Sequence, residues 1–320
     1  MEMKQLLIRT FCILTLFFIG CGDSNRATQS ELPIPEVKYT PGDIITDSQG
    51  YVSYRVGNAP IIITVPHDGI LVPSTFPDRS GETSRAENTR KVAEQFAYFF
   101  NSKSNGLYPH IIYNNVSRSK LDPDLNQTDA AQGNSYANLT YGTYHSFLQT
   151  AIDTVEFYFD AGILLNLVEH NNSGQRIELG YLLSSSDLDL TNLQLNSLEN
   201  QSSISHMSSI SNASFAEVIR GYNSLGNLIV GRSYTSNDVN YSFEAVPTLD
   251  NPNIGSTDYA SGGYTIAQYG SLNGGKINGI DIATPFAGFR DNANAYRALA
   301  VILEESVKSF YQENLGIIIY

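Results

Sequence analysis

The segment from Ile61 to Pro73, IIITVPHDGILVP, constrains the fold more than any other stretch of the chain. It opens with apolar, largely β-branched residues, which are typical of a strand buried in a parallel sheet. Pro66 ends this run, and His67, Asp68 and Gly69 follow in a turn-forming sequence. Because ligands of open α/β sheets bind beyond the carboxyl ends of the strands, this turn is a candidate for chemistry. A histidine that merely satisfies a turn is the alternative.

Strand-like and helical segments alternate along the rest of the chain. This pattern predicts an α/β fold with a three-layer arrangement, in which a mixed, mostly parallel sheet has helices on both faces. Further strands are expected at residues 51–56, 110–116, 162–168, 176–183, 264–269, 276–283 and, at an edge, 315–320. Helices are expected at 86–101, 138–160, 213–222 and 291–313. Glu87 would then lie in the first turn of a helix, where a carboxylate suits the helix dipole.

No convincing boundary interrupts residues 38–320, so we expect one domain with insertions around residues 184–262. Residues 184–214 are rich in Ser, Asn and Leu without periodicity, which indicates short helices at most. Residues 232–262 contain two prolines and little periodicity, which is typical of a long loop or a lid.

The first 21 residues resemble a bacterial lipoprotein signal peptide. Lys4 and Arg9 precede an apolar run from Phe11 to Ile19, which is too short to span a bilayer as a mature helix. The run ends at Cys21 in the sequence FIGC, which resembles a lipobox; an ordinary signal peptide with a chance cysteine is the alternative. Residues 22–37 are polar with two prolines, as expected of a tether. We therefore expect a lipid-anchored protein of the cell envelope, on the periplasmic side or the cell surface.

The charge of the chain limits the classes of molecule that it can bind. The net charge is −13, and no cluster of Lys and Arg is present to neutralise a phosphate backbone, so nucleic acid is excluded. The expected partner is a small-molecule or peptide-like substrate, with membrane contact through the lipid anchor only.

Two of the five histidines stand at the ends of predicted strands, namely His67 and His170. Catalytic zinc commonly takes three ligands from His, Glu and Asp, so Glu87 completes a candidate set with the two histidines. Asp68 and Glu169 are adjacent carboxylates that could orient a ligand or act as a general base. The set has no compact spacing such as HExxH, and packed histidines remain the alternative. No serine-hydrolase elbow, dinucleotide fingerprint or phosphate-binding lysine loop is present.

Several stretches taken together resemble the N-formylglutamate amidohydrolase family. They occur in the family's order between about residues 60 and 300, and they are VPHDG at 65–69, ENT at 87–89, SRSKLD at 117–122 with Asn126, YH at 144–145, RIELGY at 176–181, and GIDI at 279–282 with Arg290 and Asp291. The resemblance implies a zinc-carboxypeptidase-like fold and zinc-dependent hydrolysis of an amide that is not a peptide bond. It also implies that His67 and Glu87 are metal ligands and that Arg118, Asn126 and Arg176 bind substrate.

The chain departs from the family pattern at the chemical centre. Val168 stands where the family has its second histidine, and His170 follows two residues later, on the same face of the strand. Ala283 stands at the expected general base, which leaves Asp281 as the nearest carboxylate on that face, and Gln127 replaces an arginine. Two functions stay open: an envelope-anchored, metal-dependent amidohydrolase acting on a small acidic or peptide-like amide, with Asp281 and Glu169 as catalytic carboxylates, or a catalytically degenerate relative that binds a ligand or acts as a scaffold.

Deletion of residues 1–37 is expected to leave a soluble, folded protein, because no predicted strand or helix of the core lies there. Circular dichroism and gel filtration of the shortened chain test this. An insoluble or unfolded product, beside a lipidated form that folds, would place the boundary elsewhere.

Overall fold

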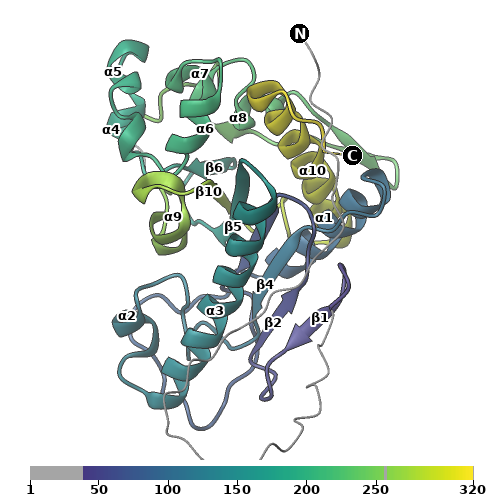
Figure 1. Cartoon of the computed structure of the whole chain (residues 1–320), viewed down its shortest axis with the longest axis vertical. Helices are drawn as coiled ribbons and strands as arrows, with labels where there is room; N and C mark the ends of the chain where they lie inside the picture. Colours follow the sequence, from purple (N-terminus) through teal and green to yellow (C-terminus); the bar gives the residue numbers. More distant parts are fainter. Residues whose placement is uncertain (1–38, 256–257, 320) are drawn as a thin grey trace, which may run out of the picture.

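An eight-stranded mixed sheet forms the centre of the computed structural model, which describes residues 39–255 and 258–319 (Figure 1). The predicted signal peptide, the tether and Cys21 lie outside these residues. The strands run in the order β1-β2-β4-β3-β5-β10-β6-β9. Their bounds are β1 (Ile44–Thr46), β2 (Val52–Arg55), β3 (Ile61–Val65), β4 (His110–Asn114), β5 (Gly162–Glu169), β6 (Ile177–Gly180), β9 (Ala245–Val246) and β10 (Ile277–Thr284).

The middle of the sheet is parallel. Parallel pairs join β4 to β3, β3 to β5 and β5 to β10, and β6 to β9 is parallel as well. The pairs β1–β2, β2–β4 and β10–β6 are antiparallel. The predicted α/β fold with a mixed, mostly parallel sheet is confirmed, and the carboxyl ends of β3, β4, β5 and β10 share one edge.

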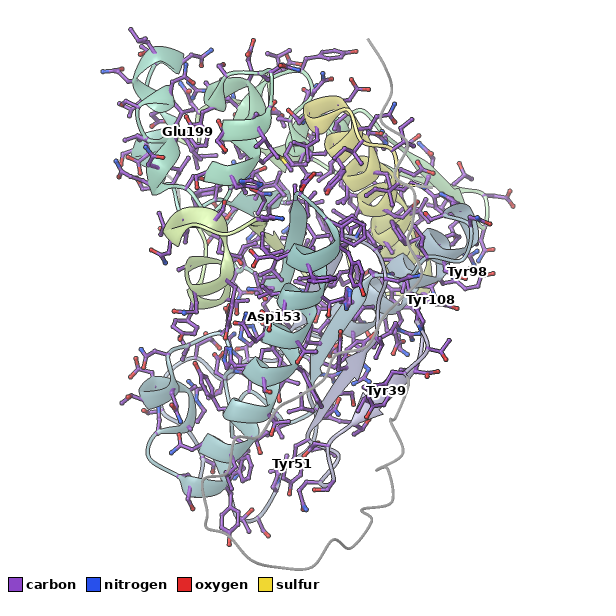
Figure 2. All side chains as sticks on the ribbon, viewed as in Figure 1. Tyr39, Tyr51, Tyr98, Tyr108, Asp153 and Glu199 are labelled. Carbon is purple, nitrogen blue, oxygen red and sulfur yellow. The ribbon has the colours of Figure 1, made fainter. Side chains whose placement is uncertain are left out.

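Helices cover both faces of the sheet. Successive side chains of a strand point to opposite faces, and the central strands are mostly apolar, so both faces must be buried. Ile61 and Ile63 of β3 pack into one core with α1 (Thr89–Lys103) and α10 (Ala293–Leu315). Ile62 packs into a second core with α3 (Ser135–Tyr158) on the opposite face. Figure 1 shows α3 on one side of the sheet and α1 beside α10 on the other. The exposed face of α3 includes Asp153 (Figure 2).

The region predicted as an insertion holds short helices, as expected. They are α4 (Ser185–Leu188), α5 (Asn192–Asn196), η1 (Glu199–Gln201), α6 (Ser205–Ile210), α7 (Phe215–Arg220) and α8 (Leu225–Val230). The expected loop at 232–262 is more ordered than predicted: it contains a hairpin of β7 (Tyr234–Ser236) and β8 (Val239–Tyr241), and it also contributes β9. A short helix, α2 (Gln127–Ala131), lies between β4 and α3.

Two predicted strands are wrong. Residues 264–269 form the helix α9 (Tyr264–Tyr269), followed by η2 (Ser271–Asn273), because a short apolar run fits a buried helix as well as a strand. At the C-terminus, α10 continues to Leu315, and Gly316 ends it in the left-handed conformation that helix C-caps favour. The described residues 316–319 form no strand. No helix of the described residues is long and apolar enough to cross a membrane.

The helix predicted at residues 86–101 begins three residues later in the structure, at Thr89, so Glu87 lies outside it. Asn88, with a φ of 67°, forms the N-cap of α1, so the helix begins at Thr89 and Glu87 precedes it. The expected place of Glu87 in the first helical turn is therefore wrong. Because Asn88 has the left-handed backbone conformation, the helix cannot extend through it to Glu87.

The turn after β3 packs against the backbone just after β4. This close approach requires a residue without a side chain at position 69, which is Gly69. A Cβ at Gly69 would stand 2.2 Å from the carbonyl oxygen of Val116, whereas a Cβ at Gly142, exposed in α3, would meet nothing within 4 Å. We expect Gly69→Ala to destabilise the protein by about 1–3 kcal/mol through overpacking. Gly142→Ala should stabilise it by about 0.5–1 kcal/mol through helix propensity. Urea unfolding of both variants is the measurement, and a Gly69→Ala variant as stable as wild type would contradict the close packing.

Candidate functional site

A cleft of ≈ 370 Å³ lies at the carboxyl edge of the parallel strands. Its walls come from four separate parts of the chain: the loop before α1, the loop after β4, the end of β5, and the segment before α9. The lining residues are Glu82, Arg118, Glu169, His170, Asn171, Asn172, Asp258, Tyr259 and Ala260. The cleft is the size of a small-molecule site, and its lining is polar and charged.

Asp122 organises the floor beside this cleft. Its Oδ1 accepts a hydrogen bond from His67 Nε2 at 2.7 Å, and its Oδ2 accepts one from Arg118 Nε at 2.9 Å. Arg79 lies 4.0 Å away on the same carboxylate, whose side chain is 1% exposed. Burial alone would raise the pKa of Asp122, but the charges and hydrogen bonds of His67 and Arg118 together hold it well below its usual range. Asp122 therefore stays ionised and fixes the position of Arg118.

His67 has the form of a metal ligand. It is 3% exposed, and its Nδ1 is buried without a hydrogen-bond partner while Nε2 is held by Asp122. Ligating histidines commonly give their second ring nitrogen to a carboxylate in this way. One member of the predicted zinc set thus fits.

The other two members do not complete the set. His170 Nε2 donates to the carbonyl of Arg176 at 2.8 Å, and its Nδ1 accepts from the backbone amide of Asn172 at 3.2 Å, so both ring nitrogens are engaged. Glu87 is exposed, and its backbone carbonyl accepts from Arg290. Among residues 39–255 and 258–319, no group of three His, Cys, Asp or Glu side chains is arranged to hold a metal ion. The donors that the fold provides do not fit the three-ligand zinc centre that the sequence predicts.

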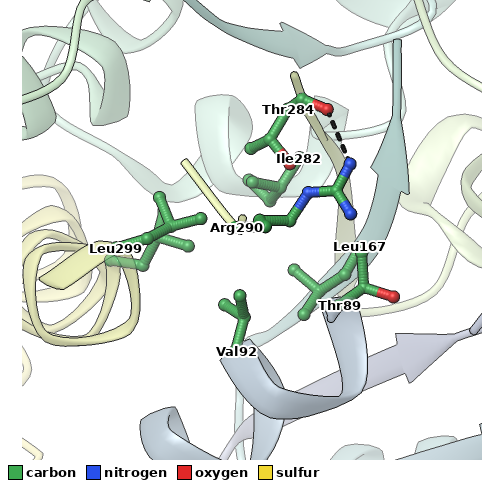
Figure 3. A pocket seen from close by; sticks show the side chains of 8 residues that line it. Thr89, Val92, Leu167, Ile282, Thr284, Arg290 and Leu299 are labelled. Atoms are coloured by element: carbon green, nitrogen blue, oxygen red, sulfur yellow. Dashed lines mark hydrogen bonds between the residues drawn. The ribbon is translucent and has the colours of Figure 1, made fainter. Parts of the chain in front are cut away.

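Glu169, predicted as a catalytic carboxylate, is neutralised by a buried cation. Arg290, whose side chain is fully buried, lies 3.3 Å from Glu169 and also donates to the carbonyl of Thr284 (Figure 3). Burial lowers the pKa of Arg290, and the charge of Glu169 counteracts this. A cavity of ≈ 10 Å³ beside Arg290 and Leu167 has room for about one water and for no ligand.

Asn166 joins two buried carboxylates behind the cleft. Its Nδ2 donates to Asp124 at 3.1 Å and to Asp281 at 2.9 Å, and its Oδ1 accepts from Thr64. Burial raises the pKa of Asp281 well above its usual value, and the nearby charge of Asp124 raises it further. Asp281, predicted as the general base, is 3% exposed and does not line the cleft.

The segment 258–265 is tied to the carboxylates of this region by its backbone. The amide of Ala260 donates to Glu178 at 2.8 Å, that of Gly263 to Asp281 at 2.8 Å, and that of Thr265 to Asp124 at 2.9 Å. These three carboxylates are all buried. They therefore hold the wall of the cleft and the start of α9 in place.

The three predicted substrate-binding residues have separate positions. Arg118 lines the cleft. Arg176 forms an ion pair with the buried Glu178 at 3.2 Å. Asn126 is the exposed N-cap of α2, where it accepts from the amide of Asp129, away from the cleft lining.

Three carboxylates at or beside the cleft were not singled out from the sequence as site residues. Asp122 and Asp124 belong to the motif loop SRSKLDPDL, where they read as surface charge; only the burial of both side chains marks them. Asp258 is in the region predicted as a loop or lid, which has no pattern that could identify it.

Comparisons with known proteins find a distant likeness. No family model and no curated protein matches the chain. Among solved structures, it is similar to an N-formylglutamate amidohydrolase from Ralstonia eutropha JMP134, at 12% identity and a TM-score of 0.44, over 80% of this chain and 95% of that one. A gene product of Agrobacterium tumefaciens is similar at 11% identity and a TM-score of 0.43, over 82% and 95%. The predicted resemblance to amidohydrolases is thus found again as a distant structural likeness, which at these TM-scores carries neither an activity nor a residue's role to this chain.

Replacing Asp122 by Asn should destabilise the protein by about 3–5 kcal/mol at pH 7, because it leaves buried cationic partners without their counterion. The folded-state pKa of Asp122 is depressed, so its contribution is present above the unfolded pKa near 4 and is lost as pH falls below it. Urea unfolding from pH 7 to pH 3 measures the difference from wild type, which should shrink with acidification. Asp153→Asn, on the exposed face of α3, is the control (Figure 2). An Asp122→Asn loss that stays constant across this range would contradict the assignment.

Proposed function

We propose that this protein binds a small, carboxylate-bearing polar ligand in the cleft at the carboxyl edge and does not hydrolyse it. From the sequence, we place it at the cell envelope through a lipid on Cys21. It is then the degenerate relative that the altered family positions suggest.

Arg118 carries this proposal. Its side chain is 15% exposed, it lines the cleft, and Asp122 holds its Nε at 2.9 Å. Because Asp122 binds Nε of this guanidinium, the two terminal nitrogens remain available. They can bind a ligand carboxylate through two parallel hydrogen bonds. One of these, Nη1, makes only a long 3.4 Å contact with the carbonyl of Ser84. A pre-positioned cation loses little side-chain entropy on binding.

The charge around Asp122 supports an anionic group at Arg118. Two guanidinium groups, of Arg79 and Arg118, lie within 4.0 Å of this single carboxylate. Because Asp122 is shared between the two, a ligand carboxylate at Arg118 would add a further favourable contact to this guanidinium.

The hydrogen bonds of the His170 ring argue against hydrolysis of the ligand. Both of its ring nitrogens are held by backbone groups, and Val168, at the family's histidine position, is an 8% exposed apolar side chain. A three-ligand site would need His170 to break two hydrogen bonds. Loss of metal ligation leaves the binding part of the site in place.

A metal-dependent amidohydrolase is the second candidate, and the unpartnered Nδ1 of His67 favours it. Stoichiometric zinc in the purified wild type that is lost in His67→Ala, together with amide hydrolysis, would decide for this candidate. Zinc that binds equally to both proteins would not.

Titration calorimetry of the purified protein with acetate, succinate and glutarate tests the binding proposal. Arg118→Gln should weaken the best of these ligands about 10- to 100-fold, which corresponds to the loss of a charge-assisted hydrogen bond of about 1.5–3 kcal/mol. Arg118→Lys should give an intermediate loss, because it keeps the charge without the fork. The control is Arg297→Gln, whose guanidinium lies over Phe99, away from the cleft lining. Equal binding by wild type and Arg118→Gln would refute the proposal.

A further inference from the structure

We infer that the ligand is zwitterionic, with its carboxylate at Arg118 and an ammonium group at the carboxylate of Asp258, and that a short peptide with free ends fits this description. The inference rests on the proposed function at Arg118 and names the chemical class of its ligand.

The cleft carries both signs of charge. Of its three carboxylates, Glu169 is paired with Arg290 at 3.3 Å. Glu82 accepts a hydrogen bond from the amide of Ser84 at 2.6 Å, and among the described residues neither Glu82 nor Asp258 has a cation within 4.0 Å. Two carboxylates of the lining are therefore without a counterion in contact, beside a single guanidinium. A purely anionic ligand would satisfy Arg118 and be repelled by both.

Arg118 and Asp258 belong to different walls. Arg118 is in the loop that follows β4, whereas Asp258 is in the segment that leads to α9. Glu82 is electrostatically close to Arg118, whose charge helps to lower the pKa of Glu82 after the larger effect of the Ser84 hydrogen bonds. Asp258 is therefore the carboxylate that supplies negative charge from the other wall.

The three residues that follow Asp258 are held by hydrogen bonds to the rest of the fold. The hydroxyl of Tyr259 donates to the carbonyl of Leu179, and the amide of Ala260 donates to the buried Glu178 at 2.8 Å. The amide of Leu182 donates to the carbonyl of Ser261 at 2.7 Å. A backbone that is held in this way loses little conformational entropy when the adjacent side chain of Asp258 binds an ammonium group.

A glycine lets this wall approach the sheet. Gly180, the last residue of β6, lies under the segment, and a Cβ there would stand 2.8 Å from the amide nitrogen of Gly262. Backbone therefore rests on backbone at this point. The close fit makes the position of the wall a property of the fold.

A dipeptide with free ends matches the cleft in size and charge. Extended chain spans about 3.3–3.6 Å per residue, so its two charged ends are separated by a few such steps. The ≈ 370 Å³ volume accommodates a ligand of this size. Its amide adds donors and acceptors for the polar lining, which includes Asn171 and Asn172.

Calorimetry with three forms of one dipeptide separates the two ends: alanylalanine, N-acetyl-alanylalanine, which lacks the ammonium group, and alanylalanine amide, which lacks the carboxylate. The proteins are the full-length wild type, Asp258→Asn, Arg118→Gln and the control Asp250→Asn. Asp250 is an exposed carboxylate of the same region that does not line the cleft.

Wild type should bind alanylalanine about tenfold more tightly than the acetylated form, as expected for one charge-assisted contact. Asp258→Asn should remove this advantage and leave binding of the acetylated form unchanged, and Asp250→Asn should change neither. Arg118→Gln should weaken both.

Equal binding of the free and acetylated dipeptides by wild type would overturn the inference, as would an Asp258→Asn variant that weakens both equally. If acetate, succinate or glutarate binds in an Arg118-dependent manner while all three dipeptides fail, this inference is wrong and the proposed function stands. If none of the carboxylates or dipeptides binds, both are wrong.

Discussion

The buried carboxylate of Asp122 joins the loops at the carboxyl edge of the sheet. It accepts hydrogen bonds from His67 and Arg118, which lie on the turn after β3 and the loop after β4. A buried carboxylate is costly unless it is paired and hydrogen-bonded, so these partners are required for the edge to fold as it does. The same pairing that pays this cost also points Arg118 toward the cleft.

The second group of buried carboxylates has a different task. Each of its three members accepts a hydrogen bond from a backbone amide of the segment 258–265; they are Glu178, Asp281 and Asp124. Asn166 supplies a further donor to both Asp124 and Asp281, so each of their oxygens has one partner. Asp281, which the sequence suggests as a catalytic carboxylate, accepts a hydrogen bond from the backbone of one wall of the cleft, as Glu178 and Asp124 do. This is why a raised pKa at Asp281 does not by itself identify a general base: burial causes the shift.

The site therefore combines a rigid frame with an altered centre. The turn of His67 and the Asp122–Arg118 pair are placed by strand ends, whereas His170 is bound to the backbone of its own loop. Strand β5 ends at Glu169, and His170 is the first residue beyond it. The amide of His170 still donates to the carbonyl of Thr284 in β10 at 3.3 Å, whereas both nitrogens of its ring are bound to backbone groups of the loop that follows.

The sequence by itself determined the α/β class, the buried strand at Ile61, the helices α3, α7 and α10, and the turn with His67 at the carboxyl end of β3. These follow from hydrophobic periodicity and from turn residues at strand ends, which act over a few neighbouring residues. It did not determine that residues 264–269 are helical, because a stretch of only six residues with mixed apolar and polar side chains suits either structure. Only the tertiary structure decided that both ring nitrogens of His170 have backbone partners, that Asp122 pairs with His67, and that Asp258 lines the cleft with Arg118. The physical reason is that the local pattern does not fix these contacts: their burial and their competing hydrogen-bond partners exist only after the strands and loops are assembled.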